Sequence, residues 1–90
     1  MKIKNVDRAV AKAFGIKISS IRESNRRREF ADARQMAWLL LKDSGFTVME
    51  LSRNYKRTHG AICVGIARMR GLIGVHRKIE EIHKEIKEEL

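Results

Sequence analysis

Two short segments of the chain concentrate side chains that bind anions. They are the tetrapeptide Lys56, Arg57, Thr58 and His59, and the three consecutive arginines Arg26, Arg27 and Arg28. Guanidinium, ammonium and imidazole groups donate charge-assisted hydrogen bonds to phosphate, and arginine also matches acceptors on base edges. These residue types at this spacing predict a surface for a polyanion rather than a reaction centre.

Groups that would support catalysis or metal binding are not arranged for it in the sequence. No nucleophile, base and orienting group occur together, and paired carboxylates occur only between 79 and 90, where they solvate a helix. His76 and His83 lack a third ligand for a metal. The single cysteine, Cys63, excludes a disulfide within the chain and is predicted to be a small buried hydrophobe. We expect no enzyme, no cofactor and no metal.

The charge balance points to the same class of partner. The chain has 20 Lys and Arg against 11 Asp and Glu, a net charge of +9. Residues 1–78 carry a net +12, whereas residues 79–90 carry −3. A basic body with an acidic tail predicts a polyanion partner for the body, the alternative being a basic protein whose charge serves solubility alone.

Composition and periodicity indicate an all-α fold in one domain over residues 1–90. The 90 residues are too few for two cores, and the sequence has no proline. Apolar residues recur at three- and four-residue steps, which predicts about six helices. The expected bounds are Asn5 to Gly15, Ser19 or Ser20 to Glu23, Phe30 to Ser44, Thr47 to a turn at 53–57, Thr58 to Ile73, and an acidic helix over 76–90.

The fourth and fifth helices form the pattern of a helix-turn-helix over about 47–73. Thr47 and Glu50 have the spacing of a capping box, and Thr58 caps the helix that follows the turn. In such a motif the second helix presents its first residues to base edges in the major groove. Two helices joined by a polar turn also occur in bundles that bind no nucleic acid.

From about Val6 to Ile79 the sequence resembles the C-terminal DNA-binding domain (domain IV) of the bacterial chromosomal replication initiator DnaA, in the Trp-repressor-like helix-turn-helix superfamily. The resemblance rests on Phe14-Gly15-Ile16, on Arg34-Gln35-Met36-Ala37 after the basic segment, and on the segment from Tyr55 to Ile62. It implies a Trp-repressor/DnaA-like fold that binds double-stranded DNA.

The resemblance also implies roles for single residues. The family's minor-groove arginine falls on Arg26, and its signature arginine and histidine fall on Arg57 and His59. The signature aspartate is replaced by Thr58, and two threonines by Gly60 and Ala61, so we expect altered or relaxed specificity. The predicted contacts are Arg26, Arg27, Arg28, Arg34, Thr47, Lys56, Arg57, Thr58, His59, Gly60 and Ala61. For Arg34, an ion pair with Asp32 or Glu29 is the alternative.

The predicted function is DNA binding in replication initiation or transcriptional regulation. The alternative is a protein-interaction adaptor that uses the basic face or the acidic helix, with itself or a replication or regulatory protein as partner. RNA binding is less favoured, because the common RNA-module signatures are missing. The sequence has no membrane span, signal peptide or Gly-rich ATPase loop. We therefore expect a free-standing cytoplasmic domain of bacterial, phage or mobile-element origin.

Overall fold

A computed structural model describes residues 2–23 and 27–90, and its regular elements there are all helices. In chain order they are α1 (Ile3–Phe14), α2 (Ile18–Arg22), α3 (Arg28–Asp43), α4 (Val48–Tyr55), α5 (His59–Val75) and α6 (Arg77–Glu89). The all-α prediction of six helices is confirmed. Within this described part, none of the helices combines the length and apolarity that crossing a bilayer would need.

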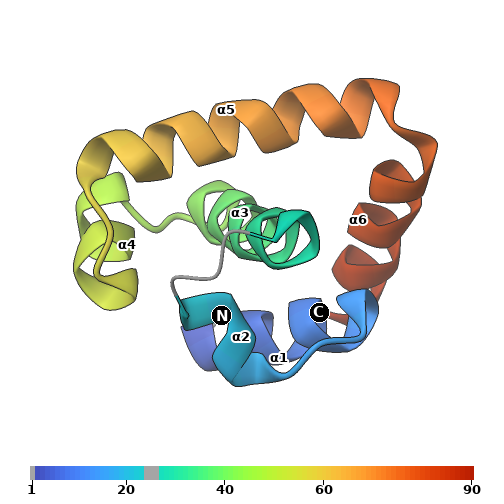
Figure 1. The fold of residues 1–90 in the computed structure, drawn as a ribbon, viewed down its shortest axis with the longest axis horizontal. Coiled ribbons are helices and arrows are strands. Elements are labelled where there is room, and N and C mark those ends of the chain that lie inside the picture. Colours follow the sequence, from blue (N-terminus) through green and yellow to red (C-terminus); the bar gives the residue numbers. More distant parts are fainter. Residues whose placement is uncertain (1, 24–26) are drawn as a thin grey trace.

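Helix α3 is the centre of the molecule. Figure 1 shows α3 almost end-on, with α5 along one side, α1 and α2 on the opposite side, and α4 and α6 at the two flanks. Every residue from 36 to 41 is buried, because this segment is apolar around its whole circumference. Helix α3 therefore packs against α1, α2 and α5, and its Trp38 also contacts Tyr55 of α4.

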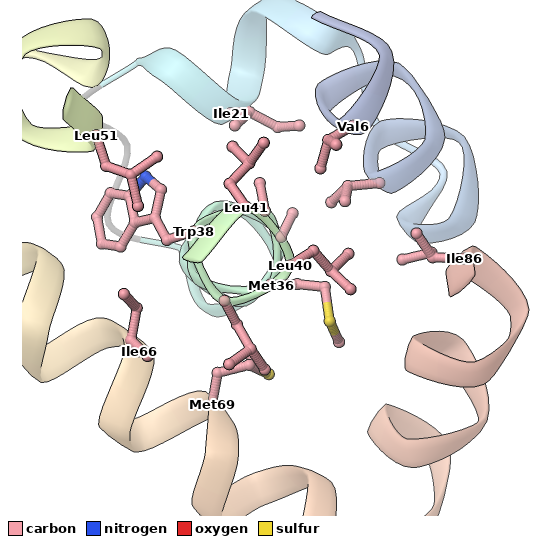
Figure 2. Packing of buried hydrophobic residues seen from close by; sticks show 14 of the residues in the cluster. Val6, Ile21, Met36, Trp38, Leu40, Leu41, Leu51, Ile66, Met69 and Ile86 are labelled. Atoms are coloured by element: carbon pink, nitrogen blue, oxygen red, sulfur yellow. The ribbon is translucent and has the colours of Figure 1, made fainter. Parts of the chain in front are cut away.

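The core is one continuous cluster around α3. Trp38 and Leu51 lie together between α3 and α4, and Ile66 and Met69 approach α3 from α5 (Figure 2). Ile86 of α6 reaches the same cluster and is fully buried. The helix-turn-helix is thus fixed on the body by packing as well as by its own turn.

Three of the predicted helix starts are wrong by one or two residues, among them that of α3, which begins at Arg28 rather than at Phe30. Helix α1 begins at Ile3 rather than at Asn5, because the carbonyl of Lys2 accepts the N–H groups of Asn5 and Val6 and Ile3 packs against the core. Helix α2 begins at Ile18. The predicted end of α1 is confirmed: Gly15 has φ 67°, a left-handed conformation that glycine adopts without steric cost.

The turn of the helix-turn-helix is shorter than predicted. Residues 53–55 continue α4 instead of starting the turn, since Tyr55 lies one helical turn after Leu51 and both side chains are buried. Only residues 56–58 remain between α4 and α5. So short a turn fixes the angle between the two helices tightly.

The acidic tail helix is part of the core. Ile79 and Ile86 of α6 are buried against the rest of the molecule, whereas the glutamates of α6 are exposed. The ring Nδ1 of His76 accepts the N–H of Ile79 at 3.4 Å and caps the helix. Helix α6 therefore completes the fold and presents its charge to solvent.

Candidate nucleic-acid interface

The predicted capping box at the start of α4 is present. The Thr47 hydroxyl oxygen accepts the N–H of Glu50 at 3.1 Å, and the Glu50 carboxylate accepts the N–H of Thr47 at 3.0 Å. The second bond holds the pKa of Glu50 below its usual value, because it stabilises the ionised carboxyl. Thr47 was predicted as a DNA contact, and in this structure its side chain is the cap of α4.

The turn itself is built around Lys56 in the left-handed conformation. Lys56 has φ 55° and ψ 49°, and its side chain is exposed. The N–H of Arg57 donates to the Ser52 carbonyl at 3.1 Å, and the Ser52 hydroxyl donates to the Arg57 carbonyl. Both bonds tie the turn back to α4 and hold the Lys56 ammonium group at the surface.

The first turn of α5 is exposed and capped. The Thr58 hydroxyl oxygen accepts the N–H of Ala61 at 3.1 Å, as predicted, and residues 58–61 are all exposed. Free N–H groups at a helix start favour negative charge. His59, Gly60 and Ala61 thus lie on a surface that attracts phosphate.

Arg57 joins the two basic segments in space. Its guanidinium Nη2 donates to the carbonyl of Glu23 at 2.8 Å, across 34 residues of sequence. Glu23 follows α2 and directly precedes residues 24–26, which lead to Arg27 and Arg28 at the start of α3. Arg27 and Arg28 are exposed; the predicted minor-groove residue Arg26 lies outside the described residues.

The interpretation of Arg34 as a DNA contact does not fit its surroundings. The residue is only 8% exposed, and its guanidinium donates to the carbonyls of Ile21 (2.9 Å) and Glu23 (2.5 Å). Burial, and then the charge of Arg57, lower the pKa of Arg34. Arg34 fixes the backbone that precedes the basic segment, so we do not keep it in the contact set.

The sequence analysis did not predict a polar cluster that holds α4 against α1 and α2. The buried carboxylate of Asp7 accepts the Tyr55 hydroxyl and, at 3.0 Å, the Arg22 guanidinium. Arg22 also lies 4.4 Å from the centre of the Tyr55 ring and donates to the Asn54 carbonyl at 2.9 Å. Burial raises the pKa of Asp7, and the bonds from Tyr55 and Arg22 oppose that rise. The sequence feature that could have indicated this cluster is Asp7 itself, a carboxylate next to Val6 on the apolar face of α1.

The outward face of α5 differs from the prediction in one respect. Cys63, predicted to be buried, is exposed, because the buried face of α5 runs through Ile62, Ile66 and Met69. The Cys63 sulfur lies 3.7 Å from Nδ1 of His59 on the preceding turn. Among the described residues, no group of three His, Cys, Asp or Glu side chains is placed to hold a metal.

A capped helix, a three-residue turn and a second capped helix with a basic, exposed start define a helix-turn-helix DNA-binding domain. The family model of the bacterial DnaA protein helix-turn-helix matches residues 3–69. The chain therefore belongs to the bacterial DnaA helix-turn-helix family, which binds double-stranded DNA and is not a catalytic family. No curated protein matches the chain. Residues 70–75 at the end of α5 and all of α6 lie outside the family match.

Proposed function

We propose that the chain, as a single domain over residues 1–90, binds duplex DNA with the start of α5 in the major groove and the segment 26–28 in the adjacent minor groove. The contact of Arg57 with the Glu23 carbonyl at 2.8 Å carries this proposal. It joins the helix-turn-helix to the backbone that leads into the basic segment. One duplex then contacts both the helix-turn-helix and the basic segment. The process in which this binding acts is replication initiation or transcriptional regulation.

The charges around α5 support this docking. Lys56 and Arg57 precede the helix, Arg27 and Arg28 follow Glu23, and the N–H groups at the start of α5 add a partial positive charge. These groups hold phosphates and so fix the position of α5 in the groove without reading sequence. Phosphate binding of this kind releases counterions, which makes the affinity fall with salt.

The base-reading positions support altered or relaxed specificity. Where the family has aspartate and two threonines, this chain has Thr58, Gly60 and Ala61, whose side chains offer one hydroxyl group in all. A Cβ built on Gly60 meets no atom within 4 Å, so the fold does not require glycine there. Gly60 thus lacks the side chain that would contact a base, and the packing of α5 does not require that side chain to be absent.

Charge and contact variants test the docking by fluorescence anisotropy over a range of salt. We expect wild-type affinity to fall by about 0.9 log unit per log unit of salt for each phosphate neutralised. Lys56→Gly suits the left-handed backbone of the turn and should reduce that slope by about one phosphate. His59→Ala should weaken binding at constant salt.

Arg77→Ala is the matched control for these variants. It removes the same unit of charge from the start of α6, at a side chain that is exposed and remote in sequence from the turn. Its salt slope should equal that of the wild type. Unchanged binding by both Lys56→Gly and His59→Ala, or a wild-type affinity insensitive to salt, would remove the basis of the proposal.

Selection from a random duplex library tests the specificity. DnaA initiators, which the chain resembles, recognise a DNA sequence called the initiator box. A selected consensus equal to that box would contradict the effect assigned to Thr58, Gly60 and Ala61. In the triple variant Thr58→Asp, Gly60→Thr, Ala61→Thr, we expect preference for that box to increase. The open space at Gly60 allows the variant to fold.

An adaptor role is the second candidate, and the observation that favours it is helix α6. This helix lies outside the family match and exposes Glu80, Glu81, Glu85 and Glu88. Deletion of α6 is unsuitable as a test, because Ile79 and Ile86 belong to the core. Replacing Glu81 and Glu85 by lysine keeps the core; loss of a protein partner with DNA affinity retained would support the adaptor.

A further inference from the structure

The outward face of α5 from His59 to Ala67 consists mostly of small and apolar side chains. Five exposed residues follow one another at steps of one, three, one and three, a spacing that places them on one helical face. They are His59, Gly60, Cys63, Val64 and Ala67. Of these five residues, only His59 and Cys63 have side chains that can make polar contacts, and those two groups approach each other at 3.7 Å. Further along the same side of α5, Arg70 pairs with Asp43 at 2.6 Å. The face is therefore poorly equipped to read bases by hydrogen bonds.

Val64 is the most prominent apolar group on that face. Its exposed fraction is 69%, whereas the apolar residues on the other side of the same helix, Ile62 and Met69, are fully buried. In Figure 1 α5 runs along one edge of the molecule with α3 and α4 to one side of it. Two valine methyl groups thus stand on the side of α5 that the body leaves open.

The major groove offers one kind of apolar partner for such a face. Each base pair presents hydrogen-bonding groups there, and thymine alone adds a methyl group. Val64 lies five residues after His59, about 7.5 Å further along the helix. The two residues are thus far enough apart to address different base pairs.

We infer that α5 reads thymine methyl groups in the major groove through Val64, which makes the chain selective for thymine at one or two fixed positions of its target. This inference rests on the proposed docking of α5. Gly60 and Ala67, on either side of Val64 on the same face, add little bulk and let the helix lie close to the bases. Specificity by methyl contact is also consistent with Gly60 and Ala61, which have no hydrogen-bonding side chain.

The test replaces single thymines by deoxyuridine in the duplex obtained from the library selection. Deoxyuridine lacks only the 5-methyl group, so base pairing and hydrogen-bonding edges stay the same. We expect wild-type affinity, measured by anisotropy, to fall about fourfold at one or two thymines, the effect of one buried methyl group, and to stay constant at the others.

Val64→Ala identifies the residue that makes the contact. In this variant the sensitive thymines should tolerate deoxyuridine with less than about a twofold change, because the methyl has lost its partner. Val75→Ala is the matched control: this valine is on the same helix, is 84% exposed and lies at the far end of α5. It should bind and respond to deoxyuridine as the wild type does. Circular dichroism checks that both variants are folded.

The outcomes separate this inference from the proposed function. If the wild type shows no salt-dependent binding to duplex DNA, the proposed function itself fails. If it binds but no deoxyuridine position matters, or the selected consensus contains no thymine, only the thymine reading is overturned. A methyl effect that persists in Val64→Ala, or DNA affinity unchanged in Val64→Ala, overturns the role of Val64 and leaves its side chain available to a protein partner.

Discussion

Two glycines of α5, five residues apart, have different roles. A Cβ on Gly60 meets no atom within 4 Å, whereas one on Gly65 would lie 2.7 Å from Cζ3 of Trp38 and 2.9 Å from Cγ of Gln35. Gly65 is therefore a point of close approach between α5 and α3. The spacing between α5 and α3 at this position depends on the absence of a side chain at Gly65.

Gly65→Ala should destabilise the fold. Overpacking against the indole costs about 1–3 kcal/mol, which outweighs the gain of up to ~1 kcal/mol from replacing glycine within a helix. Gly71→Ala, on the same helix with open space around its Cβ, should instead stabilise by up to ~1 kcal/mol. Urea denaturation of the two variants checks this; equal stabilisation by both would show that α5 does not need close contact at residue 65.

At the scale of elements, α4 depends on its cap more than the longer helices do. It has eight residues, fewer than an isolated helix needs to form, and its first turn is held by the Thr47–Glu50 pair. The Asp7, Arg22 and Tyr55 cluster holds its other end. Capping and tertiary contacts together keep α4 in place as the brace for α5.

Thr47→Ala should lower the free energy of unfolding by about 1 kcal/mol, because the N–H of Glu50 loses its acceptor. Denaturation at neutral pH measures the loss. Ser19→Ala, an exposed hydroxyl residue of α2 that does not cap a helix, is the control and should unfold like the wild type. If Ser19→Ala lowered the free energy of unfolding as much as Thr47→Ala, the loss could not be attributed to the cap of α4.

The capping box also predicts a dependence on pH. The pKa of Glu50 is lower in the folded chain than its usual value of 4.5, so its contribution to stability is present above that pH. It is lost as the pH falls through the folded-state pKa. Glu50→Gln should lack this part of the acid-induced loss, and the two stability curves should converge at low pH. Parallel curves over the whole range would argue against the bond to the Thr47 N–H.

At the scale of the whole molecule, the acidic tail helix holds the basic domain together. Helix α6 packs on α1 and α5 through Ile79 and Ile86, and Lys12 of α1 pairs with Glu89 at 3.4 Å. That exposed ion pair contributes little, so the apolar contacts carry the stability. The basic body and the acidic tail helix thus share one hydrophobic core.

Ile86→Ala should lower the free energy of unfolding by about 2–4 kcal/mol, since a fully buried side chain leaves a cavity. The free energy of unfolding of a folded domain is roughly 5–15 kcal/mol in total, so this loss is a large share of it. Thermal and urea unfolding check it, with Glu85→Ala on the exposed face of α6 as control. A near-wild-type midpoint for Ile86→Ala would mean that α6 is an appendage.

The sequence by itself determined the features that depend on neighbours along the chain. The caps at Thr47 and Thr58 bond to N–H groups three residues later, and Gly15 ends α1 through its own backbone freedom. These interactions are local, so residue order alone specifies them. The net charge of +9, which favours a polyanion as partner, also comes from composition alone, because net charge needs no fold.

Only the tertiary structure decided which side chains are buried and which distant ones meet. In α5 apolar residues surround the helix axis, so their periodicity does not specify which face is exposed. Packing of Gly65 against Trp38 places Cys63 and Val64 on the outward face. Arg34 and Arg57 have the same charge, yet one is buried and the other bridges the turn to Glu23. Such outcomes depend on contacts between residues far apart in the chain, which composition and spacing do not encode.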